Sequence, residues 1–304
     1  MPEIRPINWL KIAVLAGIWG ASFMFVSIAL QAAGPLTIVA VRLSLGAAFL
    51  LLLCRLKGIG LPARGGDNAG RIWGFAVLMG LFSNVIPFSL LSWAQQSVAS
   101  GFAGVSMAVV PLLVLPLAHL LVPGETMTLR RTAGFLTGTA GVIVLIGPGA
   151  FTSTGNELET LARLACIGAA GCYAVGSIST RLCPPVNMLS LSAAALAVAA
   201  LIAVPLALLV EGVPKSIDIR TLFALLYLGI LPTGVAQLIL TQVVRDAGPV
   251  FMGLTNYQVP VWSVIFGAVI LSEPLPPSLL LALALILGGV ALSQLGALRR
   301  LFRK

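Results

Sequence analysis

The apolar residues of this chain fall into ten blocks, each long enough to cross a lipid bilayer. Hydrophobic residues make up 59% of the 304 and charged residues only 9%, too few to cover the surface of a water-soluble fold. A bilayer span needs about 20 apolar residues whose backbone hydrogen bonds close within the segment. We therefore predict an all-α membrane protein with ten transmembrane helices, over residues 9–31, 36–54, 70–93, 99–121, 130–147, 160–182, 187–210, 220–244, 250–271 and 276–296.

Lysine and arginine indicate the orientation of these spans. With a cytoplasmic N-terminus, 14 of the 18 basic residues fall on the inner side, 3 on the outer side (Arg163, Lys215 and Arg220), and Arg42 within a span. An odd number of spans would destroy this bias, so we expect both termini in the cytoplasm. The net charge of +9 then reports topology and contact with anionic lipid, and it does not indicate nucleic-acid binding.

The two halves of the chain repeat one another. Pro111 in the fourth span matches Pro260 in the ninth, and Gly80 matches Gly229 at the same offset. Each half holds five spans, and an odd number makes equivalent helices run in opposite directions. This is the inverted-repeat plan of secondary transporters, with a binding site near the midplane. We predict two five-helix repeats, residues 1–147 and 148–304.

These features carry a resemblance to a known family. The pair Trp19-Gly20, the arginine of the second span, the mid-span prolines, the glutamates that close those spans and the glycine-rich fifth and tenth spans resemble the drug/metabolite transporter superfamily. Within it the chain is similar to the EamA-type exporters over residues 9–296, and among these to the YddG-like amino-acid exporters. The resemblance implies that spans 1, 3, 4, 6, 8 and 9 surround a central cavity, with spans 2, 5, 7 and 10 outside it or bracing it.

The acidic residues bear on energy coupling. None of the nine lies in the middle of a span, whereas a carrier driven by protons or sodium ions usually keeps a carboxylate at depth. We therefore expect facilitated movement down the substrate gradient rather than cationic-drug/proton antiport. The chain has no GxSxG, HExxH or GK[ST] motif, so we expect no enzymatic activity, no cofactor and no metal.

Polar residues within the spans are the candidates for substrate binding. Thr233 and Gln237 share one face of the eighth span, and Asn84 and Phe88 are their counterparts in the third. Such side chains could serve only to join helices. Because several lie on repeat-related helices, we expect them to hold the amino and carboxyl groups of a zwitterion while aromatic rings contact its side chain. The predicted substrate-binding set is Trp19, Asn84, Phe88, Tyr173, Thr233, Gln237, Asn256 and Tyr257.

Four further residues are candidates for a gate or hinge: Pro111, Pro260, His119 and Arg42. Proline removes a helix hydrogen bond and bends its span. Arg42 lies roughly 10 Å into the second span at 1.5 Å per residue, where it either snorkels to the interface or attracts a substrate carboxylate. His119 is the single histidine, with either a structural role or a pH-sensitive one.

Glycine pairs in the fifth and tenth spans predict close helix packing. Gly134-x-x-x-Gly138 and Gly288-Gly289 let backbones approach each other, within one chain or across a dimer face. We expect a monomer, with a homodimer as the alternative.

The sequence as a whole favours a transporter of a bacterial inner membrane. We expect it to export small organic metabolites, amino acids with aromatic or hydrophobic side chains first among them, by alternating access around a central cavity. Its partners would be the small-molecule substrate and membrane lipid. The alternatives are a drug or nucleobase-type metabolite exporter and a membrane-embedded enzyme, which would need clustered Asp, Glu or His residues.

Overall fold

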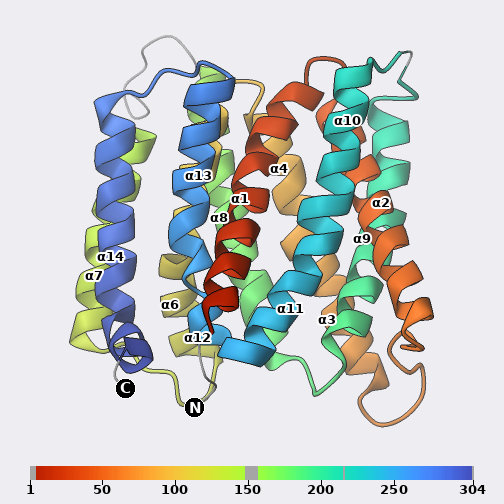
Figure 1. Ribbon diagram of the computed structural model, residues 1–304, viewed down its shortest axis with the longest axis horizontal. Coiled ribbons are helices and arrows are strands. Elements are labelled where there is room, and N and C mark those ends of the chain that lie inside the picture. The colour runs from red at the N-terminus through yellow and green to blue at the C-terminus, as the bar shows by residue number, and fades with distance from the viewer. Residues whose placement is uncertain (1–4, 148–156, 215, 303–304) are drawn as a thin grey trace.

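The computed structural model describes residues 5–147, 157–214 and 216–302, and all regular secondary structure in these ranges is helical (Figure 1). The first half contains α1 (Pro6–Ala29), α2 (Pro35–Leu56), α3 (Ala69–Gly80), η1 (Leu81–Val85), α4 (Ile86–Ala94), α5 (Ser100–Ser106), η2 (Met107–Val109), α6 (Val110–Leu121) and α7 (Leu129–Ile146). The second half contains α8 (Glu157–Leu182), α9 (Met188–Val210), α10 (Ile219–Leu228), η4 (Gly229–Val235), α11 (Ala236–Ala247), α12 (Pro249–Met252), α13 (Thr255–Ile270) and α14 (Pro277–Phe302). Lys215 and the expected repeat boundary at residue 148 lie outside the described residues.

Nine helical segments of the described chain are long and apolar enough to cross a membrane, and they correspond to nine of the ten predicted spans. The exception is the predicted span over 250–271. It is divided into α12, of four residues, and α13, of 16 residues, by a turn at Gly253 and Leu254. The polar segment Thr255 to Gln258 opens α13 directly after this turn. The ninth expected span is therefore not one continuous helix.

The helices lie side by side, with α1 beginning and α14 ending at the same edge of the bundle (Figure 1). We call this edge the lower end and the opposite edge the upper end. The start of α2 lies at the upper end, and its last turn lies at the lower end beside the start of α9, where the Cys54 thiol approaches the Leu189 carbonyl oxygen. The position of each functional residue along its helix is described below relative to these two ends.

Glycine brings α7 and α14 together. A Cβ atom added at Gly289 would lie 2.5 Å from the Gly134 carbonyl oxygen and 2.5 Å from the Gly138 nitrogen. At Gly141 an added Cβ would lie 2.7 Å from Ile286 Cγ1. Only residues without a side chain permit this separation, so these glycines form a packing surface within the chain. The dimer face considered from the sequence is thus occupied internally.

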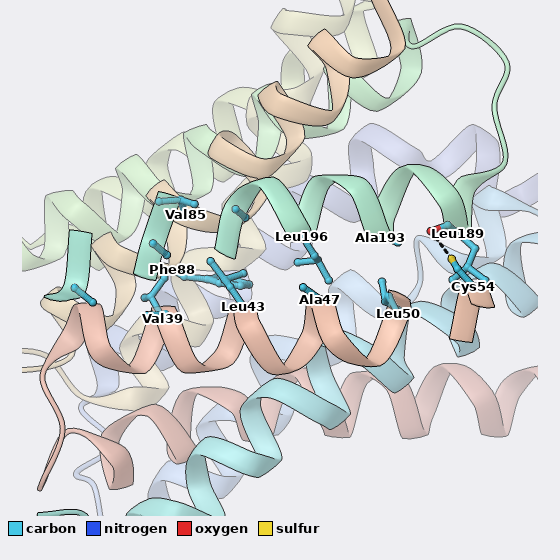
Figure 2. Close-up of a cluster of buried hydrophobic side chains, with 14 residues drawn as sticks. Val39, Leu43, Ala47, Leu50, Cys54, Val85, Phe88, Leu189, Ala193 and Leu196 are labelled. Carbon is cyan, nitrogen blue, oxygen red and sulfur yellow. Dashed lines mark hydrogen bonds between the residues drawn. The ribbon is translucent and has the colours of Figure 1, made fainter. Parts of the chain in front are cut away.

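A second packed region joins α2 to α9 and to the η1–α4 segment. Val39, Leu43, Ala47 and Leu50 recur along one side of α2 and face Ala193 and Leu196 of α9 and Phe88 of α4 (Figure 2). These residues repeat every three or four positions, which places them on one helix face. The face holds α2 against the wall of the central cavity described below.

Two glutamates close helix ends at the upper end of the bundle. Glu211, directly after α9, accepts hydrogen bonds from the Leu36 and Thr37 backbone nitrogens at 2.9 and 2.8 Å. Glu273, after α13, accepts from the Ser100 and Gly101 nitrogens at 2.7 and 3.0 Å. The first N–H groups of a helix have no partner inside it, so each carboxylate satisfies donors that hydrocarbon could not. Both contacts join distant spans at the upper end.

Candidate functional site

A central cavity of about 460 Å³ lies between the two halves. Nine of the twelve predicted site residues line it: Trp19, Arg42, Asn84, Phe88, Tyr173, Thr233, Gln237, Asn256 and Pro260. They come from α1, α2, η1, α4, α8, η4, α11 and α13. The volume suits a small organic ligand, since binding cavities commonly measure about 300–1,000 Å³.

Three predicted residues lie outside this lining. Pro111 occupies the first turn of α6, directly after the 3₁₀ turn η2, while its neighbours Met107 and Val110 do line the cavity. His119 is exposed near the lower end of α6, with Nδ1 3.1 Å from the Glu125 carbonyl oxygen. Tyr257 packs against the apolar cluster between α5, α6 and α14. In this structure none of the three contacts the space where a ligand would sit.

Two spans contribute more than the family resemblance implied. Arg42 and Leu50 of α2 line the cavity, as do Met188, Ser192 and Leu196 of α9. These helices were expected outside the cavity or bracing it. Their packing against each other brings one face of each to the cavity wall.

The third and eighth spans are interrupted by π-helical segments at matching places. The segment η1 (Leu81–Val85) carries Asn84, and η4 (Gly229–Val235) carries Thr233. Asn84 Nδ2 donates to the Met79 carbonyl oxygen at 3.1 Å, and Thr233 Oγ1 donates to the Leu228 carbonyl oxygen at 2.8 Å. Each side chain thus bonds to the carbonyl oxygen five residues before it, across the widened turn. Such π-turns frequently mark functional sites.

The two π-helices share the repeat offset that relates Pro111 to Pro260. The sequence analysis matched Asn84 to Thr233 but did not predict the change of helix type. Proline gives the available signal, because Pro87 follows η1 and Pro232 lies inside η4. A proline removes one backbone donor and favours a local rearrangement of the ladder. The carbonyl four residues before Pro232, that of Leu228, is the one bonded by Thr233 Oγ1, and the Pro232 carbonyl oxygen itself accepts from Trp19 Nε1 at 3.1 Å.

Arg42 is the one basic side chain in the described cavity wall, and it is 8% exposed. Its Nε donates to Thr233 Oγ1 at 3.0 Å, and its guanidinium carbon lies 3.7 Å from the centre of the Phe88 ring. Among the residues described, no acidic side chain lines the cavity. The guanidinium is therefore held by a hydroxyl and an aromatic face, with its remaining N–H groups free of a counter-ion.

The amide side chains differ in their surroundings. Gln237 Nε2 donates to Ser192 Oγ at 2.8 Å, so it both joins α11 to α9 and borders the cavity. Asn256 is exposed within the bundle, although it lies at the second position of a span helix. Exposure of an amide at this depth indicates contact with the cavity rather than with lipid.

Small hydroxyl residues were missed by the sequence analysis. Ser83, Ser177, Thr180 and Ser192 also line the cavity. Ser177 and Thr180 follow Tyr173 by four and seven residues on α8, which is the spacing of one helix face. This spacing was available in the sequence, but serine and threonine are also common in helix contacts of membrane proteins.

The cavity extends towards the lower end of the bundle. It reaches Met188, the first residue of α9, which is 39% exposed, and Thr180 near the end of α8. Near their midpoints α1 and α13 pack closely: an added Cβ at Gly20 would lie 2.6 Å from Trp262 Cβ. Further up, beyond the end of α13, Glu273 joins that helix to the start of α5. The structure thus combines a closed upper end with a cavity that approaches the lower one.

Comparison with known proteins gives matches over nearly the whole chain. The model of the EamA-like transporter family matches residues 7–147 and 160–295. The inner membrane transporter YedA of Escherichia coli K12, itself uncharacterized, is 27% identical over 281 residues, covering 92% of this chain and 88% of YedA. The uncharacterized transporter YoaV of Bacillus subtilis is 22% identical over 287 residues, covering 93% and 95% of the two chains.

Two further relatives extend the comparison. A protein of Chlamydia trachomatis named as an S-adenosylmethionine/S-adenosylhomocysteine transporter is 24% identical over 292 residues, covering 91% of this chain and 86% of its own. A protein of known crystal structure superposes with a TM-score of 0.68 at 23% identity, covering 97% of this chain and 100% of the other. At this identity the superposition shows the fold alone.

Proposed function

Because this chain belongs to the EamA-like transporter family, we propose that it exports amino acids with aromatic or hydrophobic side chains by alternating access around the central cavity. The protein is a multi-pass transporter of the inner membrane, and its family implies small-molecule substrates. The specific substrate and the direction of transport are the proposal. The substrate class is inferred from the chemistry of the cavity wall.

The buried guanidinium of Arg42 is the observation that carries this proposal. A charge taken out of water is unfavourable unless an opposite charge or several hydrogen bonds compensate it. Within the described wall, Thr233 and Phe88 compensate only part of the guanidinium. A substrate carboxylate would supply the missing charge through paired N–H···O bonds, which are stronger than neutral hydrogen bonds.

The rest of the wall suits the other parts of an amino acid. Trp19, Phe88 and Tyr173 offer aromatic surface close to Arg42. Gln237 and Asn256 offer carbonyl oxygens that could accept from an ammonium group. A cationic drug would meet the uncompensated positive charge of Arg42 instead, so the same wall disfavours it.

The transport cycle is proposed to use ten spans in two inverted repeats, residues 1–147 and 148–304. Support comes from the start of α1 and the end of α14 at one edge, which requires an even number of crossings, with α12 and α13 together forming the ninth (Figure 1). The paired π-helices and the two separate matches to the family model support the repeat. We place the lower end in the cytoplasm, where most basic residues gather. A monomer suffices, because the glycine faces pack within the chain.

A second candidate substrate is a nucleoside-linked amino acid. The Chlamydia relative is named for S-adenosylmethionine and S-adenosylhomocysteine, which both join an amino-acid carboxylate to an aromatic base. Arg42 and the nearby rings would suit both parts, and the cavity of 460 Å³ leaves room for them. With this candidate Arg42 would still bind a carboxylate, and the aromatic surface would contact the base instead of an amino-acid side chain.

The test is uptake into proteoliposomes containing the purified protein. Labelled phenylalanine, tryptophan, leucine, lysine and S-adenosylmethionine are compared at equal concentration, with and without a pH gradient. We expect uptake of the aromatic and hydrophobic amino acids down their own gradients, unchanged when the pH gradient is collapsed. Uptake of lysine alone, or of none of the amino acids, would contradict the proposed substrate class. Uptake that stops without the pH gradient would contradict facilitated movement.

A further inference from the structure

A second, smaller cavity of about 30 Å³ borders the central one. The two cavities share Ser22, Phe23, Arg42, Phe88 and Tyr173. Beyond these residues the small cavity adds Val26, Leu91, Ser92 and Gln95, which all lie closer to the ends of α1 and α4 at the upper end. Arg42, Phe88 and Tyr173 therefore form a partition, with the central cavity below it and the small cavity above it.

The small cavity carries a hydrogen-bond donor that lacks a protein partner. Gln95 is 8% exposed, and its Nε2 has no hydrogen-bond partner among the described residues, while its Oε1 accepts from Ser27 Oγ at 3.3 Å. Ser92 is 2% exposed on the same wall. A buried amide group is unfavourable when its donors are unmatched. The presence of the Gln95 amide at the end of a span indicates that a group with an acceptor atom binds to it there.

Among the described residues that line the small cavity, the charged side chain is positive. Arg42 forms its floor, and no acidic side chain lines it among the described residues. At the upper end, Glu211 and Glu273 are engaged with the helix starts of α2 and α5. At 30 Å³ the cavity holds about one or two water molecules in this conformation. Its donors and its positive charge suit a small anionic group in place of that water.

We propose that the small cavity is an exit subsite for the carboxylate of the substrate. Arg42 faces both cavities, so its guanidinium can remain paired with the carboxylate while the partition opens. Gln95 Nε2 and Ser92 Oγ then donate to the carboxylate on the upper side. A continuous series of donors spares the anion an unpaired passage through the apolar partition. This inference rests on the proposed function, because it assumes an exported substrate with a carboxylate.

The first test separates binding from passage. Gln95→Leu removes an unmatched donor that lies outside the central cavity, and Gln96→Leu is the matched control, because Gln96 is exposed and lines neither cavity. We expect Gln95→Leu to lower phenylalanine exchange across proteoliposomes about tenfold, the value of roughly one hydrogen bond to a charged group. The Kd for phenylalanine should stay near that of the wild type, and the melting temperature near that of Ser27→Ala, which loses the same hydrogen bond between Ser27 and Gln95. An unchanged exchange rate, or a parallel loss of phenylalanine affinity and of melting temperature relative to Ser27→Ala, overturns the subsite.

The second test does not depend on the identity of the substrate. Ser92→Cys is treated from the outside with an anionic and a cationic methanethiosulfonate reagent, and each rate is divided by the rate with a free thiol. We expect the anionic reagent to react several-fold faster. Ser89→Cys, on the same helix but lining neither cavity, and the wild type with its own four cysteines give the background. Absence of reaction or of anion preference overturns the subsite. Anion preference without phenylalanine transport retains the subsite and overturns the amino-acid assignment.

Discussion

Replacement of Arg42 by methionine tests the chemistry of the central cavity most directly. Methionine keeps an unbranched apolar chain of similar length but removes the charge, the bond from Nε to Thr233 Oγ1 and the stacking on Phe88. If Arg42 pairs with a substrate carboxylate, the variant loses hydrogen bonds to a charged group worth about 1.5–3 kcal/mol. This corresponds to roughly 10- to 150-fold weaker binding of phenylalanine.

The melting temperature, unlike the affinity, should not fall in this variant. Arg42 is buried without an acidic partner among the residues described, and replacement of a buried charge by an apolar group is often neutral or stabilising. We therefore expect the ligand-free Arg42→Met variant to melt at the same temperature as the wild type or higher. Arg71→Met, at an exposed position of α3, is the matched control and should change neither affinity nor melting temperature.

The assay combines the variant with a changed ligand. Binding of phenylalanine and of phenylalaninamide, which lacks the carboxylate charge, is measured for the wild type and for Arg42→Met. The wild type should prefer phenylalanine, and the variant should lose this preference, so that the coupling energy of the cycle isolates the contact. Equal preference for phenylalanine in both proteins would refute the assignment of Arg42. Loss of affinity for both ligands alike would indicate a structural role.

Three further predictions concern packing, the cavity wall and topology. Gly289→Ala should destabilise the protein by about 1–3 kcal/mol, because the added methyl group meets α7 at 2.5 Å, whereas Gly288→Ala, with open space around it, should not; equal melting temperatures would contradict the packing. Gln237→Leu should weaken phenylalanine binding and also lower the melting temperature, because the amide bonds to α9 as well as bordering the cavity; a loss of stability with unchanged affinity would leave only the structural role. In cells, a cysteine at Ser216 should react with an impermeant thiol reagent from outside while one at Ala63 should not, both positions being exposed in loops; the reverse labelling would invert the orientation.

Many residues that line the central cavity could be named from the sequence, but their contacts could not; that they bind substrate stays a prediction. The repeat offset and the spacing of polar residues selected Asn84 and Thr233, and separate arguments on aromatic, arginine and proline residues supplied others of the nine that line the cavity. The same arguments placed Tyr257 with them, although it packs against an apolar cluster one helix face away. The sequence places both Asn256 and Tyr257 shortly before Pro260, and it does not decide which of the two side chains faces the cavity.

Local helix geometry also escaped the sequence analysis. The apolar length of the third and eighth spans predicts helices, but it does not distinguish an α-turn from the π-turns at η1 and η4. Their free energies differ by contacts that other helices supply, such as the bond from Trp19 Nε1 to the Pro232 carbonyl oxygen. The break between α12 and α13 has the same character, because the span length alone favours one continuous helix there.

The sequence by itself determined the solvent of this protein, its helical class and the approximate limits of its spans. These properties follow from transfer of each segment into lipid, which depends on the composition of that segment alone. The tertiary structure decided which groups meet: Arg42 with Thr233, and Gly134 with Gly289. The partners of each pair are distant in the chain, so their contact depends on how whole helices cross. Helix crossing is set by the sum of many weak packing contacts, and no local pattern records that sum.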